Sequence, residues 1–258
     1  DTTDMARVLQ QKREAELSLL QSLRSVELND LAGQIAHEMC NPLAVIVSSC
    51  QFLKLKLSKG KMEHKDWQDS LDKIQSSTGR MNEVIEDMRM LTGRNEPGTQ
   101  AESVELAAVL SEVYDLFMDD IMRENISIHS DVGRLKVLGV YIQVKQMFVQ
   151  IIRNAIEALK SVEQKEKVIE ITATNSSEKI GYVLLRIKNN GPKIDPPEKE
   201  KILKPFFTTK EVGLGVGLGL SIAESLVRSF RGELKVAEEG PWTCFDILLL
   251  APEEGEED

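Results

Sequence analysis

The chain has 258 residues, of which 41% are hydrophobic and 29% are charged, and its formal net charge is −10. This length suits two domains with separate cores, and the composition is ordinary for soluble proteins. No basic stripe is interleaved with aromatic residues, so we expect no nucleic-acid partner.

The N-terminal third predicts two long helices that pack as a hairpin. Residues 5–57 form the first helix, bent near Pro42, which has no amide hydrogen for a helical bond. Upstream of Leu28 the apolar pattern is irregular, so residues 1–27 are expected to be a coiled-coil lead-in. Residues 65–92 form the second helix, whose inward side chains are spaced alternately by four and three: Trp67, Leu71, Ile74, Thr78, Met81, Ile85 and Met88.

One apolar stripe on each helix cannot be buried well within a single hairpin. We therefore expect two hairpins to pair in a homodimer, so that residues 28–93 form half of a four-helix bundle. Helical periodicity ends in a stretch rich in glycine and proline at residues 93–99, and residues 94–103 are the expected linker.

Residues 104–251 are expected to form a second domain, an α+β sandwich, because helices are grouped around hairpin-like strands rather than alternating with them. The last residues, 252–258, are an acidic tail. Helices are predicted at 107–117, 140–159 and 221–230, and strands at 103–106, 126–132, 168–174, 182–187, 232–236 and 244–250.

His37 is the most informative residue of the first domain. It lies in His37-Glu-Met-Cys-Asn-Pro-Leu43, on the helix face opposite the apolar residues, and Asn41 one turn later points the same way. An acid follows it directly, which suits an exposed nucleophile beside a base. The alternative is an ordinary solvated helix residue, as we expect for His64 and His129 in their own settings.

Four segments of the second domain carry polar or glycine-rich features. Asn154 follows Gln150 by one turn, and its amide oxygen is a suitable magnesium ligand when phosphates supply other oxygens. A turn at residues 188–192 and an aromatic pair within 204–210 come next. Glycines then alternate over residues 213–219 before a helix, an arrangement that can bind phosphate or simply form a flexible loop.

Taken in order, these segments resemble bacterial two-component sensor histidine kinases over roughly residues 28–250. Residues 37–43 are similar to the acceptor-histidine box, and the four later segments are similar to the N, G1, F and G2 boxes. The resemblance implies that the second domain has the ATPase fold shared by gyrase, chaperones, histidine kinases and MutL.

The resemblance also implies the reaction. His37 takes the γ-phosphoryl group of ATP, Glu38 orients the ring and accepts its other proton, and the group passes to an aspartate of a separate response regulator. Asn41 is the residue expected to position water for dephosphorylation of that regulator, which makes a second, phosphatase activity plausible.

By the same resemblance, Asn154 binds Mg²⁺, Asn189 faces adenine, and Lys210 contacts a phosphate. Phe206 and Phe207 are expected to anchor the lid over the nucleotide, although paired aromatics can also be core residues. The full set of expected nucleotide contacts is Gln150, Asn154, Asn189, Gly191, Phe206, Phe207, Lys210, Gly215, Gly217, Leu218 and Gly219.

Three residues depart from the family pattern. Asn189 stands where Asp is usual, Lys193 replaces a glycine, and Val216 replaces a hydroxyl residue. The lost charge assistance at Asn189 is worth ~1 kcal/mol, so ATP binding should be weaker but retained. The alternatives are a catalytically weak, nucleotide-sensing dimeric scaffold and an ATPase that transfers the phosphoryl group to water.

The sequence contains no apolar run of about 18 residues and begins with polar residues, so neither a membrane span nor a signal peptide is expected. Its three cysteines lack metal-ligand spacing and suit a reducing compartment. We expect a cytoplasmic protein, or the cytoplasmic portion of a kinase that reaches a membrane only through an upstream segment.

Overall fold

The computed structural model describes residue 33 and residues 35–60, 63–91, 100–163, 166–209 and 217–252. The chain divides into two compact units, Asp1–Glu86 and Asp87–Asp258. The predicted lead-in at 1–27 lies outside the described residues, as do most of the linker and all but the first residue of the acidic tail.

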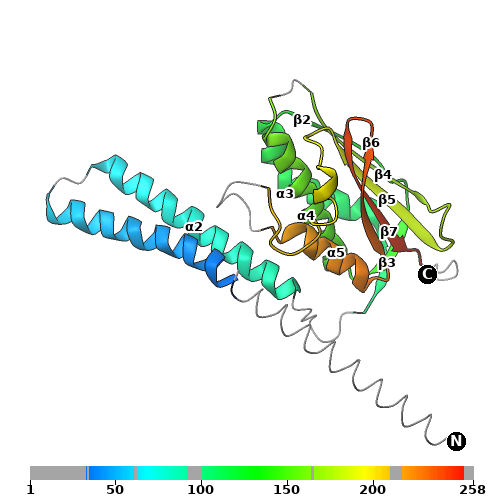
Figure 1. The fold of residues 1–258 in the computed structure, drawn as a ribbon, viewed down its shortest axis with the longest axis horizontal. Coiled ribbons are helices and arrows are strands. Elements are labelled where there is room, and N and C mark those ends of the chain that lie inside the picture. Colours follow the sequence, from blue (N-terminus) through cyan, green and yellow to red (C-terminus); the bar gives the residue numbers. More distant parts are fainter. Residues whose placement is uncertain are drawn as a thin grey trace, which may run out of the picture. The chain divides into compact units, whose positions relative to one another are not determined.

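The first unit is a helical hairpin, as predicted (Figure 1). The first helix runs without interruption over residues 35–58, and α2 spans His64–Leu91. Asp66 stabilises the start of α2, because its carboxylate accepts a hydrogen bond from the Glu63 amide at 3.1 Å. The same carboxylate lies 3.1 Å from Lys56 Nζ, so it also ties the two helices together beside their turn.

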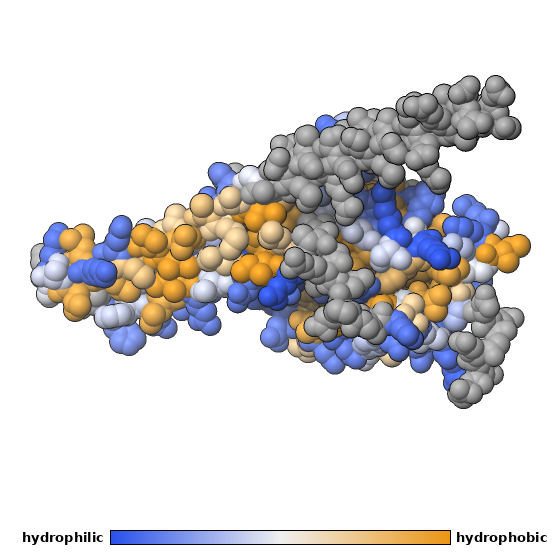
Figure 2. Space-filling view, turned by 90° about the horizontal axis from the view of Figure 1, so that it is seen from below, coloured by the Kyte–Doolittle hydropathy of each residue, from blue (hydrophilic) through white to orange (hydrophobic). Residues whose placement is uncertain are grey.

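This hairpin leaves many large apolar side chains in water. Val84 is fully buried, whereas Leu55 is 54% exposed and Leu71 is 54% exposed. Figure 2 shows apolar side chains gathered along the hairpin. The other exposed members in this unit are Leu43, Val45, Val47, Phe52, Leu57 and Trp67. The hairpin therefore has more apolar surface than its own two helices cover, as the sequence pattern predicts.

The second unit is built on a five-stranded mixed sheet in the order β2-β4-β5-β7-β6. β2 and β4 are parallel, and every other neighbouring pair is antiparallel. A separate antiparallel pair joins β1 and β3. The strands are β1 Glu102–Glu105, β2 Ile126–Asp131, β3 Lys136–Gly139, β4 Lys167–Asn175, β5 Tyr182–Asn189, β6 Glu233–Glu239 and β7 Trp242–Leu250.

Three helices cover one face of this sheet: α3 (Leu106–Arg123), α4 (Tyr141–Lys160) and α5 (Gly219–Ser229) (Figure 1). Alternate residues of β5 face these helices, and Leu185 and Ile187 are fully buried there. Phe148 and Ile152 of α4 are also fully buried in the same core. The predicted α+β sandwich is confirmed.

Charged cross-strand pairs occupy the other face of the sheet. Arg186 of β5 lies opposite Asp246 of β7 and donates two hydrogen bonds to its carboxylate, at 2.6 and 2.7 Å. This pairing raises the pKa of the Arg186 guanidinium. Lys188 pairs with Glu170 of β4 at 2.8 Å, which raises the pKa of the Lys188 ammonium group. Such pairs support one register of β5 and thereby place Asn189, its last residue.

Within the described residues the predicted elements are present, with differences at their ends, and the part of the first helix predicted before residue 33 lies outside them. The helix predicted at 107–117 continues to Arg123, and β3 and a 3-10 turn at Pro196–Glu198 were not predicted. β3 has only four residues and depends on β1 as its partner, so local alternation gives little sign of it. Among the helices that the structure describes, none combines the length and hydropathy needed to span a membrane.

Candidate functional site

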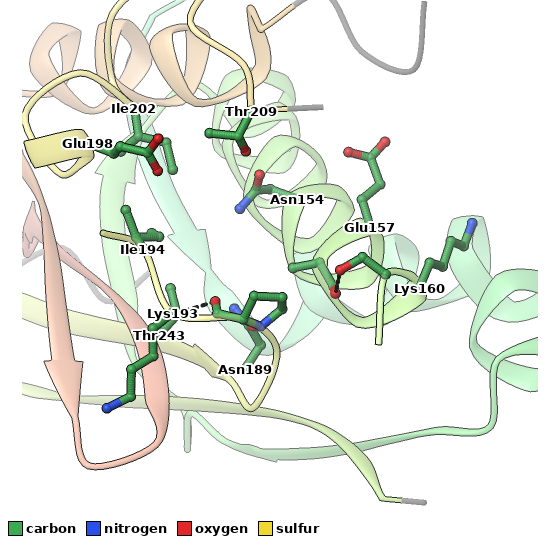
Figure 3. Close-up of a pocket in the computed structure, with 13 residues that line it drawn as sticks. Asn154, Glu157, Lys160, Asn189, Lys193, Ile194, Glu198, Ile202, Thr209 and Thr243 are labelled. Carbon is green, nitrogen blue, oxygen red and sulfur yellow. Dashed lines mark hydrogen bonds between the residues drawn. The ribbon is translucent and has the colours of Figure 1, made fainter. Parts of the chain in front are cut away.

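The second unit contains a pocket of about 690 Å³, within the range of small-molecule sites. The last turns of α4, the end of β5, the loop after it and the start of β7 surround the pocket (Figure 3). Its lining residues are Asn154, Glu157, Ala158, Lys160, Ser161, Asn189, Pro192, Lys193, Ile194, Glu198, Ile202, Thr209 and Thr243.

Asn154 and Asn189, two of the predicted site residues, meet in this pocket although they are far apart in the sequence. Asn154 is half-buried on α4, and no described residue forms a hydrogen bond with its side chain. Its amide oxygen is thus available for a cation, and the Glu157 carboxylate lines the same wall one turn later. These oxygen donors fit Mg²⁺ that is bound together with phosphate.

Asn189 is almost completely buried, with 1% of its surface exposed. Its Oδ1 accepts a hydrogen bond from the Gly191 amide at 3.1 Å, whereas its Nδ2 has no hydrogen-bond partner among the described residues. A Cβ at Gly191 would lie 2.9 Å from that Oδ1 and 3.3 Å from Ala158. A side chain at Gly191 would therefore disturb Asn189, although Gly191 itself is not among the residues that line the pocket.

Four charged side chains and three hydroxyl side chains in the pocket were not predicted as site residues. Lys160 pairs with Asp120 at 2.9 Å, and this pairing lowers the pKa of the Asp120 carboxyl. Lys193, considered only as a departure from the family pattern, also lines the pocket, as do Glu157 and Glu198. Thr243 lies opposite Asn189 in the strand register, and its hydroxyl donates to the Pro192 carbonyl at 3.1 Å.

Gly217 is the first described residue of the glycine-rich segment, and its φ is 72°. A Cβ there would lie 2.6 Å from the Phe207 carbonyl oxygen, so these two segments are in tight backbone contact. Phe206 also has a positive φ, 63°, and packs against the core, while Phe207 is half-buried. Lys210, Gly215 and Val216 lie outside the described residues.

Three other predicted site residues, Gln150 of α4 and Leu218 and Gly219, pack together at the start of α5. Leu218 is 1% exposed and Gln150 is 3% exposed. Gln150 Oε1 lies 2.8 Å from the position that a Cβ would take at Gly219, so Gly219 lets α4 and α5 approach closely. None of Gln150, Gly217, Leu218 and Gly219, and neither Phe206 nor Phe207, lines the described pocket.

His37 is exposed on the first helix of the hairpin. The amide nitrogen of Asn41 lies 3.5 Å from His37 Nδ1, consistent with the predicted common face of these two residues. Glu38 is half-buried beside them. The imidazole is accessible to a reaction partner, and one of its nitrogens has a neighbouring polar group.

Two family models match the chain in the same order as the two units. Residues 27–96 match the His Kinase A (phospho-acceptor) domain. Residues 139–253 match the histidine kinase-, DNA gyrase B- and HSP90-like ATPase family. The first match contains His37, and the second contains the whole pocket.

Similar proteins are sensor kinases of bacteria. Two-component sensor PprA of Pseudomonas aeruginosa is 25% identical over 92% of this chain and 26% of its own length. Sporulation kinase C of Bacillus subtilis is 28% identical over 86% of this chain and 48% of its own length. The chain thus spans less than half of either relative.

Solved structures show the same fold. Histidine kinase ThkA in complex with response regulator protein TrrA matches with a TM-score of 0.67 and 24% identity, covering 90% of this chain and 64% of that one. The catalytic domain of ThkA matches with a TM-score of 0.51 and 29% identity, covering 59% of this chain and 96% of that one. The chain belongs to the bacterial two-component sensor histidine kinases.

Proposed function

We propose that this chain transfers the γ-phosphoryl group of ATP to His37 and then to an aspartate of a response regulator. The observation that carries this proposal is the presence, in one chain, of an accessible His37 on a helical hairpin and a pocket with two inward asparagines. The names of the relatives, a two-component sensor and a sporulation kinase, support the same class of reaction.

In the pocket, Asn154 is the proposed ligand of Mg²⁺, and Asn189 is the proposed contact of the base. Magnesium, when bound, neutralises charge on the phosphate oxygens. Lys193 is the lining cation nearest in sequence to Asn189 and is a proposed contact for the phosphates, whereas Lys160 is paired with Asp120. Gly217 lies against Phe207, and Lys210 and Gly215 are proposed to form part of a lid over the nucleotide.

At His37, the nucleophile is proposed to be the ring nitrogen that faces water. Its lone pair forms a bond to the γ-phosphorus while the bond between that phosphorus and the β,γ-bridging oxygen breaks, and ADP leaves. Glu38 is proposed to accept the proton of the other ring nitrogen, so that the attacking nitrogen stays unprotonated. The aspartate of the regulator then takes the phosphoryl group from the histidine.

Labelled ATP tests this function. Wild-type protein should gain an acid-labile, base-stable phosphoryl label, and His37→Gln should lose at least about 99% of it because no other group has this role. His64→Gln is the matched control, since His64 is also an exposed histidine of the hairpin. Equal labelling of the wild type and His37→Gln would contradict the proposal.

Asn41 carries a separate proposal, that it positions water for dephosphorylation of the regulator. Its amide lies beside the imidazole, within reach of a group bound there. Asn41→Ala should spare labelling of His37 and slow release of phosphate from the phosphorylated regulator about tenfold or more. Gln51→Ala, an exposed amide on the same helix, is the control. Equal loss of both activities would show that Asn41 has a different role.

A dimeric scaffold that senses nucleotide is the alternative function, and the absence of a carboxylate at Asn189 is the observation that favours it. Nucleotide binding without any labelling of the protein would support the scaffold. Rapid release of free phosphate without labelling would instead support an ATPase that uses water. The homodimer is proposed for the kinase and for the scaffold alike.

A further inference from the structure

The side-chain amide of Asn189 has one orientation that the fold selects. Only an oxygen can accept the hydrogen bond from the Gly191 amide, so the 3.1 Å contact identifies Oδ1 and turns Nδ2 the other way. Nδ2 is buried and has no partner in the part of the chain that the structure describes. Buried donors in folded proteins are almost always paired. A bound ligand could supply the acceptor that this atom lacks.

This buried donor belongs to a residue that lines the pocket. Asn189 belongs to the lining, and its side chain extends from the end of β5 toward the pocket in Figure 3. The opposite residue, Thr243, already uses its hydroxyl hydrogen on the Pro192 carbonyl. Asn189 Nδ2 is therefore a side-chain donor at the end of β5 that has no partner among the described residues.

Purine bases differ in what they offer to such a group. Adenine has an amino donor at position 6 and an acceptor at N1, whereas a 6-oxopurine has an oxygen acceptor at position 6 and a proton on N1. An amide has both a donor and an acceptor, so it can pair with either edge. An ionised carboxylate has acceptors alone, so it can accept from N1–H of a 6-oxopurine but offers no donor to the oxygen at position 6.

We infer that Asn189 lets this pocket take 6-oxopurine nucleotides as well as adenine nucleotides, and that this residue sets the choice of base. The inference rests on the proposed nucleotide function of the pocket and names its substrate class more closely. The unpaired Nδ2 donates to the oxygen at position 6 or to N1 of adenine. A site that leaves no buried polar group unpaired with either base discriminates weakly between them.

The test compares ADP with IDP, whose bases differ at position 6 and in the proton on N1. Isothermal titration of both with the full chain and Mg²⁺ avoids phosphoryl transfer. The wild type should bind IDP within about tenfold of ADP, and Asn189→Asp should widen the preference for ADP by about 10- to 100-fold. Ser161→Asp, which adds the same charge at an exposed lining residue, should leave the ratio unchanged.

Each outcome separates this inference from the proposed function. Binding of ADP with IDP weaker by 100-fold or more in the wild type would overturn the inference and leave the kinase function intact. An equal ratio in the wild type and a folded Asn189→Asp would also overturn it. No binding of either nucleotide would overturn the proposed function itself. If Asn189→Asp does not fold, the wild-type ratio alone decides.

Discussion

Both the backbone conformation and the close neighbours of Gly217 require a glycine at this position. Its φ of 72° is accessible to few residues other than glycine, and a Cβ there would lie 2.6 Å from the Phe207 carbonyl oxygen. Gly240 has a similar φ, 59°, but nothing lies within 4 Å of the place where its Cβ would be. A side chain would therefore add backbone strain at both positions, but steric crowding at Gly217 alone.

Substitution by alanine should consequently affect the two positions differently. Gly240→Ala should lower the free energy of unfolding by about 1 kcal/mol, because it adds backbone strain alone. Gly217→Ala should lower it by about 1–3 kcal/mol more, because the backbone of Phe206 and Phe207 must also move. Urea unfolding of both variants measures this difference, and equal losses would show that the contact at Gly217 is unimportant.

The two adjacent asparagines at the end of β5 illustrate what the residue types alone do not reveal. Asn190 Oδ1 accepts from the Val168 amide at 2.8 Å, and its Nδ2 donates to the Glu166 carbonyl at 2.9 Å. Its amide fastens the turn, whereas that of Asn189 faces the pocket. The sequence indicates a turn near a ligand, but the division of these roles depends on contacts with β4.

At the scale of helices and strands, local periodicity was sufficient for most of the second unit. The alternation in β5 and the spacing of inward residues in α4 predict both elements closely. β3 was missed because it has four residues and is stabilised by β1. The last third of α3, from Met118 to Arg123, lies beyond the predicted helix because exposed Met118 and Met122 obscure the amphipathic pattern there.

The pocket was predictable only where one element carries the signal. Asn154 stands out within a helix, and Glu157 and Lys160 follow it at spacings that suit the same side of α4. Thr243 reaches the pocket because β7 pairs with β5, which brings it opposite Asn189. Such long-range pairing has no local mark in the sequence, so Thr243 could not be found without the sheet.

At the scale of the whole molecule, the exposed apolar side chains of the hairpin support the proposed homodimer. Leu71→Glu should weaken self-association by about 10- to 100-fold, because the dimer interface would have to bury an unpaired carboxylate from each subunit. Analytical ultracentrifugation over a range of concentrations measures this. Ile180→Glu is the control, since Ile180 is 98% exposed in the turn before β5. A Leu71→Glu dimer as tight as the wild type would exclude this face.

The identity of the phosphorylated residue tests the central claim most directly. After incubation with Mg²⁺ and ATP, mass spectrometry of the protein kept at neutral or alkaline pH should place the phosphoryl group on His37. His64 and His129, both outside the proposed phosphoacceptor site, should remain unmodified. A phosphoryl group on another residue, with His37 unmodified, would contradict the account.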